Sequence, residues 1–449
     1  MGILETVQRC QWFRRRGCRL LPLTWIGCVV LFLWTLPAFA QEELRPSSVG
    51  ARLDPQTTPA LPGYNLKVGP LDFTASASLQ TEFNDNVSLS TNNPISDEII
   101  TPTISLQMFW QLSPFNSIQV NTAVGYMWYI NHPEVIGAGS AFTIAPDSEI
   151  NFKAFVGQVT FNFYDRFSLE QDPATNAKVS NVPQLGEFVN SAGVDAFWRF
   201  NPALSFQIGF NNTNLTSTNS TLAFDTYSEN QLTFSSRLTF HPSVSGGLEG
   251  SVASTAYQSQ SKPDSISTNL GPFLDIDLSK FTHLRLAGGY QMINFQGNAS
   301  TGILNPPGTD TFIETNTNAP AQNQNGFYFN GEISNQLTTR IQQKLSAGRE
   351  LSLSVTADST TEYYLRYSVK WQPNRLVTLG GSFSFENGSS IGELNSERYK
   401  QYVAELMAGY KLSDAIYLTF DYRYVSRASS ISLNGYDQNI VSLSIDYRF

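Results

Sequence analysis

The sequence predicts an all-β protein, a transmembrane antiparallel up-and-down β-barrel of about 18 strands. Three observations carry this prediction. Apolar side chains recur at every second position from Leu71 to the last residue, the polar connections alternate between short and long, and the chain ends with an alternating segment on Phe449. Side chains on a strand point alternately to opposite faces, so each such segment has one apolar face and one polar face.

The composition excludes several other classes. Of the 449 residues 14% are charged, 13% are aromatic and the formal net charge is −9. A disordered chain would carry more charge and fewer aromatic residues, and a nucleic-acid-binding protein would carry a basic surplus. Repeated apolar stretches of about 18 residues, which helical membrane proteins need, are missing. We therefore expect no nucleic-acid partner.

Residues 1–40 have the pattern of a signal peptide. An arginine-rich start precedes an apolar run from Leu20 to Leu36, and the small residues Ala38 and Ala40 predict cleavage before Gln41. The apolar run is slightly long, so an uncleaved anchor is the alternative. The three cysteines all lie in this leader, which leaves the rest of the chain without a thiol for a disulfide, a zinc site or a nucleophile.

Residues 41–70 contain five prolines and little periodicity. This composition predicts an extended periplasmic segment or a short plug rather than a domain. From residue 71 to residue 449 the period-two pattern is continuous, which predicts that the barrel occupies 71–449.

The period-two segments fit a membrane better than a soluble core. A soluble sandwich would bury the apolar face, whereas a membrane barrel turns it to lipid and keeps the polar face inside. Segments such as 363–371 reach the ~9–11 residues of a tilted spanning strand. Aromatic residues stand at the ends of the apolar faces, as in interfacial girdles, and charged residues occupy the polar faces, which a dry core would not accept.

The connections give the strand count. Short turns occur at 113–116, 201–202, 241–243, 280–282, 372–374 and 413–414, and most of them contain Pro or Asn. Longer polar stretches lie at 131–147, 169–187, 297–324 and 387–396. Counting strands between them gives about 18, with 16 as the alternative because the turn at 156–158 is unclear. Short periplasmic turns and long outer loops are typical of bacterial outer-membrane barrels.

The chain terminus carries the strongest local pattern. Apolar residues alternate back from the C-terminal Phe, as in the strand that the outer-membrane assembly machinery recognises. The residues of this predicted assembly signal are Val441, Leu443, Ile445, Tyr447 and Phe449. Together with the leader they predict the bacterial outer membrane as the location and the barrel assembly machinery as a partner.

About residues 66–449 resemble the broad family of β-barrel porins of bacterial outer membranes. The segment 66–70 before the first strand, the Pro/Asn turns and the ending Tyr447-Arg448-Phe449 carry this resemblance. It implies a channel that contacts outer-membrane lipid and lipopolysaccharide. Some members look like outer-membrane components of exopolysaccharide export, which implies polysaccharide export components as further partners.

Inward-facing polar residues are the candidates for a conduction path. Roughly half of any barrel points inward, so most such residues serve as solvated wall or as ion pairs across strands. Two inward tyrosines could bind sugars, since aromatic rings stack against sugar rings. The candidate lumen-lining residues are Arg285, Glu362, Tyr364, Arg366, Lys370, Glu405, Tyr417, Asp421 and Arg423.

No residue pattern predicts catalysis, a cofactor or a metal site. Of the three histidines only His132 lies at an expected outer rim, where a polar turn is its ordinary role. We therefore expect a channel for passive or guided passage of small hydrophilic solutes or glycans. A structural or adhesive barrel acting through loops such as 297–324 is the alternative, and a rim enzyme depending on His132 is a distant third.

Overall fold

The computed structural model describes residues 64–133, 141–173, 182, 184–296, 302–304, 313–315, 321–355, 357–392 and 396–449. The predicted signal peptide, its cleavage site at Ala38, Ala40 and Gln41, and residues 41–63 lie outside this part of the chain. Most of the predicted long loop 297–324 also lies outside it.

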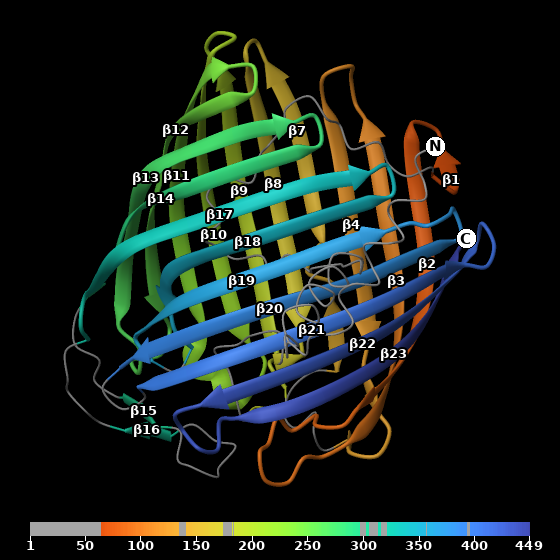
Figure 1. The fold of residues 1–449 in the computed structure, drawn as a ribbon, viewed down its shortest axis with the longest axis vertical. Coiled ribbons are helices and arrows are strands. Elements are labelled where there is room, and N and C mark those ends of the chain that lie inside the picture. The colour runs from red at the N-terminus through yellow and green to blue at the C-terminus, as the bar shows by residue number, and fades with distance from the viewer. Residues whose placement is uncertain are drawn as a thin grey trace, which may run out of the picture. The chain divides into compact units, whose positions relative to one another are not determined.

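Within these residues eighteen antiparallel strands form the wall of a barrel (Figure 1). The first nine are β2 (Leu71–Asn84), β3 (Asp97–Gln111), β4 (Ser117–Tyr126), β7 (Glu149–Val156), β8 (Val159–Glu170), β9 (Glu187–Arg199), β10 (Leu204–Ser217), β11 (Tyr227–His241) and β12 (Val244–Tyr257). The other nine are β13 (Asp264–Ser279), β14 (Thr282–Gln296), β17 (Gln324–Thr338), β18 (Ile341–Leu353), β19 (Ser359–Trp371), β20 (Val377–Ile391), β21 (Glu397–Lys411), β22 (Ile416–Ser429) and β23 (Tyr436–Arg448).

The short elements extend the wall or sit in its connections. Strand β5 (Trp128–Tyr129) continues β4 along β3, and β6 (Phe142–Ile144) continues β7 between β4 and β8. The pair β15 (Gly302–Leu304) and β16 (Ile313–Thr315) forms a separate two-stranded ladder, and the 3₁₀-helix η4 (Ser220–Asp225) lies between β10 and β11.

Pairing between the first and last wall strands closes the barrel. Each wall strand pairs with the next one along the chain, and β2 also pairs with β23, from Ser76 opposite Arg448 to Asn84 opposite Ile440. The prediction of an all-β barrel with 18 strands is confirmed. The turn at 156–158, which the sequence left unclear, closes a hairpin between β7 and β8. Gly157 lies in this turn, and its φ of +64° favours glycine.

The N-terminal residues before the wall complete this seam. Strand β1 (Leu66–Val68) folds back on β2 beyond the end of β23. Between them, the Asn65 side chain donates to the carbonyl oxygen of Ala75 at 2.7 Å and accepts from its N–H at 3.1 Å. The amide of Phe449 also donates to the Ala75 carbonyl oxygen, at 3.2 Å. A side-chain amide thus supplies the hydrogen bonds that a ladder residue would make.

The connections differ in length at the two ends of the barrel, which we call the turn end and the loop end. The predicted short turns all lie at the turn end, and Asn201 Oδ1 shapes one of them by accepting from the amides of Ala203 and Leu204 at 2.8 Å. An additional turn at 339–340 has neither Pro nor Asn. The amide of Arg340 donates there to Thr338 Oγ1 at 3.1 Å.

The predicted bounds of the long loop at 387–396 are wrong. Strand β20 continues to Ile391, so that the connection to β21 spans only 392–396. The polar run from Asn387 to Ser390 looks like a loop, but it stays in register with β19 and β21. At Gly388 an added Cβ would lie 2.1 Å from Tyr399 Cζ, so a glycine leaves the space that the tyrosine ring fills.

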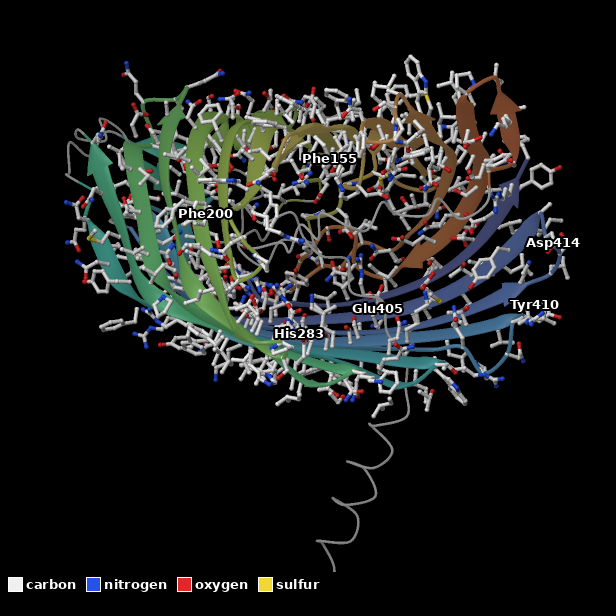
Figure 2. All side chains as sticks on the ribbon, turned by 90° about the horizontal axis from the view of Figure 1, so that it is seen from above. Phe155, Phe200, His283, Glu405, Tyr410 and Asp414 are labelled. Carbon is white, nitrogen blue, oxygen red and sulfur yellow. The ribbon has the colours of Figure 1, made fainter. Side chains whose placement is uncertain are left out.

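Apolar side chains cover the outside of the wall and polar ones the inside. Exposed apolar residues such as Ile208 (57%) and Leu232 (53%) alternate with inward Gln207 and Thr233. In Figure 2, Tyr410 lies on the outer surface and Glu405 on the inner one. Aromatic pairs mark both ends of the exterior: Trp198 with Phe200 at the turn end, and Tyr290 with Phe327 at the loop end.

This division of faces predicts an asymmetric response to new charge. The variant Ile208→Arg should destabilise the folded barrel in lipid by about 2–4 kcal/mol, because it turns a cation to the hydrocarbon. The neighbouring variant Gln207→Arg should change stability little, since its side chain faces the interior. Urea unfolding in lipid vesicles measures both. Equal destabilisation by the two variants would contradict the orientation of β10.

Candidate functional site in the barrel interior

All nine candidate lumen-lining residues lie on the inward strand faces, opposite the exposed apolar side chains, but they do not form one cluster. Arg285 belongs to β14, four residues lie on β19, and four lie on β21 and β22. That they line a conduction path stays a prediction.

Arg285 belongs to a charge network on β11–β14 that includes residues the sequence reasoning missed. It lies directly opposite Asp275, with Nη1 3.0 Å from Asp275 Oδ2, and it also pairs with Glu249. Arg237 Nη1 reaches the same Asp275 oxygen at 2.7 Å. Both guanidinium groups lie over the Phe273 ring, at 4.6 and 5.1 Å from its centroid. Two cations thus balance two nearly buried carboxylates, and the strand register that pairs them is invisible in the sequence.

The candidates on β19 also pair along the wall. Arg366 Nη2 lies 2.6 Å from Glu386 Oε1 on β20, and its guanidinium stands 4.8 Å from the Tyr364 ring centroid. Glu362 is fully buried and accepts from the Tyr399 hydroxyl at 3.4 Å. Lys370 lies near the turn end of the same strand and is half-buried. The charges of this region therefore largely offset one another at the wall.

Inward tyrosines lie flat against glycines of the neighbouring strand. A Cβ added at Gly348 would lie 2.5 Å from the Tyr364 hydroxyl, and one added at Gly409 would lie 1.9 Å from the Tyr417 hydroxyl. Each ring thus occupies the space above a residue without a side chain. One ring face covers the wall in this arrangement, and the Arg366 guanidinium stands over the ring of Tyr364 as well.

The candidates on β21 and β22 face a loop that crosses the interior. Arg423 on β22 forms an ion pair with Asp172, which follows β8. Five wall strands separate β22 from β8 in the ladder order β22–β23–β2–β3–β4–β7–β8 of the described residues. The pair therefore joins distant parts of the wall. Glu405 and Asp421 lie on the same inward faces, close to Arg423.

Residues from four loops meet at the loop end. A dry apolar cluster brings together Val182 and Leu185 from the β8–β9 loop, Leu222 and Phe224 from η4, and Val355 from the β18–β19 loop. Each of these side chains is at most 8% exposed. Burying one such side chain contributes about 1.5–3 kcal/mol, so the cluster can hold the loops together.

A buried lysine ties the fourth loop to this cluster. Lys262, between β12 and β13, pairs with Asp225 and donates to the carbonyl oxygen of Ser354 at 2.6 Å. We call residues 171–173, 182, 184–186, 220–225, 262 and 354–355 the loop bridge. It links connections on opposite sides of the barrel and narrows the loop end.

A further loop folds onto the inner wall beside the bridge. In the β2–β3 connection, Leu89 is fully buried against Val425, Tyr436 and Val403. Its φ of +49° is unusual for a residue other than glycine, and such strain is typical of functional segments. An apolar patch at the loop end of the inner wall is thereby covered by the chain itself.

The surroundings of His132 are those of a polar turn. The backbone amide of His132 donates to Asp97 Oδ2 at 2.9 Å, and the amide of Asn131 donates to the other carboxylate oxygen. Among the described residues no group of three or more His, Cys, Asp or Glu side chains could hold a metal ion. No helix in the described segments is long and apolar enough to cross a membrane.

The fold and its surfaces define the class of protein. A closed antiparallel barrel with an apolar exterior, aromatic residues at both ends, short turns and longer loops is the architecture of bacterial outer-membrane barrels. The protein is an outer-membrane β-barrel of porin-like construction.

Comparisons with known proteins find similarity in structure only. No family model matches the sequence, and no curated protein matches it. The crystal structure of Pseudomonas aeruginosa OpdK with vanillate is similar with 11% identity and a TM-score of 0.44, covering 84% of this chain and 99% of that chain. Pseudomonas aeruginosa OccK5 (OpdH) has 11% identity and a TM-score of 0.44, covering 84% and 98%. A loop-deletion mutant of OmpT, an outer membrane protein of Vibrio cholerae, has 8% identity and a TM-score of 0.38, covering 85% and 100%.

The ion pair between Asp172 and Arg423 gives a prediction about loop anchoring. Either Asp172→Asn or Arg423→Gln should release the β8–β9 loop, because each removes the charge of one member of the ion pair. A charge-assisted hydrogen bond of about 1.5–3 kcal/mol corresponds to about tenfold or more in loop opening. Trypsin cleavage after Lys178 in that loop should accelerate accordingly.

The matched control is Arg366→Gln, which breaks an ion pair between two neighbouring wall strands. It removes an inward cation of the same kind and should leave the cleavage rate unchanged. A rate that is the same in all three variants and in the wild type would show that the ion pair does not hold the loop.

Proposed function

We propose that the protein is a passive outer-membrane channel for small hydrophilic solutes, narrowed at its outer mouth by the loop bridge. Barrels of 16–18 strands leave an aqueous interior, unlike those of about eight strands, which side chains fill. The observation that carries the proposal is the closed wall of 18 strands whose inner face bears paired charges. Such a surface suits a solvated pore, because a dry interior would not accept so many polar groups.

The pairing of the inward charges favours weak ion selectivity. Rings of one sign select ions, whereas Arg285, Arg366 and Arg423 each lie beside a carboxylate on the inner surface. The proposed channel therefore discriminates mainly by the width left beside the loop bridge. A structural or adhesive barrel is the second candidate function, because the loop bridge folds over the proposed outer mouth.

Conductance of the refolded chain from residue 41 onward in a planar lipid bilayer tests the proposal. We expect stable open steps that are smaller than those of an unobstructed barrel of this size. Releasing the bridge with Lys262→Ala, which removes the tie to Asp225 and Ser354, should raise the current per step. A folded, heat-modifiable barrel that never conducts would contradict the proposed channel function and favour the adhesive alternative.

Passage of glycans is the finer part of the proposal. The inward position of Tyr364 and Tyr417 on the wall supports it, since aromatic rings can stack on sugar rings. Oligosaccharides should then block the current, and Tyr364→Leu with Tyr417→Leu should weaken the block about tenfold, while Tyr410→Leu on the outer surface should not. Oligosaccharide block that is the same in the double variant Tyr364→Leu/Tyr417→Leu and in Tyr410→Leu would remove the two inward tyrosines from the path. A link to exopolysaccharide export stays a prediction from the sequence resemblance.

A further inference from the structure

On the described wall strands, the outward-facing positive charge lies in one region of the barrel. On the described wall strands three cationic side chains point outward: Arg349 on β18, and Arg398 and Lys400 on β21. All three lie at the loop end of the neighbouring strands β18–β21. The outward acidic residues of the described wall strands, Glu98, Asp165, Asp264 and Asp437, belong to β3, β8, β13 and β23.

The strand register sets the spacing of these cations. Arg349 lies opposite Tyr363, Tyr363 opposite Asn387, and Asn387 opposite Lys400, so the four form one row across the exterior. Neighbouring strands are about 4.8 Å apart, which puts the ends of the row about 14 Å from each other. Arg398 lies on the same face of β21, two residues closer to the loop end than Lys400, and opposite Ser389.

The row lies where the apolar exterior ends. The next row toward the middle of the barrel includes Phe385 and Tyr402, whose ring centroids are 4.9 Å apart. Aromatic side chains of this kind mark the interface between hydrocarbon and headgroups. A cation on the lipid-facing surface costs about 2–4 kcal/mol at the midplane but only about 0–1 near the interface. The three cations thus stand at the depth of the headgroups.

The side chains are arranged for a ligand outside the protein. Arg349 donates to the carbonyl oxygen of Phe327 and lies 5.7 Å from the Tyr363 ring centroid, which fixes it on the surface. Arg398 and Lys400 are exposed, and neither side chain has a hydrogen bond or an ion pair within the described part of the chain. Guanidinium and ammonium groups are the usual partners of phosphate.

We propose that Arg349, Arg398 and Lys400 form a binding site on the outer surface for the phosphorylated headgroup of a glycolipid in the outer leaflet. The spread of the row suits a headgroup that carries two phosphates, one for Arg349 and one for the pair on β21. Asn387 and Ser389, between them, supply hydrogen-bonding groups for a sugar. This site depends on the barrel spanning the outer membrane and is independent of whether the interior conducts.

Native mass spectrometry of the refolded barrel in detergent, with bisphosphorylated and monophosphorylated lipid A as probes, tests the site. We expect one bisphosphorylated molecule per barrel, bound at least about tenfold more tightly than the monophosphorylated one. The double variant Arg398→Ala/Lys400→Ala should lower that affinity about tenfold or more, because each charge-assisted contact is worth about that factor. Arg398→Lys should retain most of it.

The matched control is Lys280→Ala/Arg375→Ala, which removes two cations from the turn end. It should leave lipid binding unchanged, and heat-modifiable migration shows that every variant folds. Equal loss of binding in the control would mean that overall charge attracts the lipid, and the site would be overturned. Competition by millimolar inorganic phosphate that displaces the lipid completely would equally overturn a lipid site in favour of a simple anion site.

Discussion

Closure of the wall between β2 and β23 is the constraint on which the rest of the structure depends. In hydrocarbon every backbone N–H and C=O must be paired, so a spanning sheet cannot leave an open edge. The ladder from Ser76 to Asn84 meets this requirement over most of β2. Strand β1 and the Asn65 side chain meet it where β23 has ended. Within the described residues, the chain thus uses its N-terminal approach to cover the part of the seam that its last strand leaves open.

Closure at 18 strands creates an interior that side chains alone do not fill, and the chain reduces that space in two ways. Inward tyrosines and arginines lie along the wall, over glycines and against carboxylates, so that polar groups stay paired. The loop bridge and the β2–β3 connection fold inward at one end, where apolar clusters hold them. The turn end remains free of such loops within the described residues. The narrow part of the proposed path therefore lies at the outer mouth.

The fold was predictable because period-two patterning and turn residues are local. The alternation along β19 and β22 and the turns at Asn201 and Pro242 each need only a few neighbouring residues to be recognised. The site was less predictable, since it depends on contacts distant in sequence. Nothing near Arg285 in the sequence indicates Glu249, and nothing near Arg423 indicates Asp172, because register and loop folding bring each pair together. For the same reason the polar run at 387–390 resembled a loop, although its neighbours keep it in the wall.

The most direct test of the account is the accessibility of alternate residues on one strand. Since the sequence after residue 40 has no cysteine, single cysteines at Leu365, Arg366, Tyr367 and Ser368 of β19 can be labelled without background. With the barrel in lipid vesicles, a small water-soluble thiol reagent should react with the cysteines at 366 and 368 and spare those at 365 and 367. Reaction at all four positions, or at none, would contradict a lipid-facing exterior around a water-filled interior.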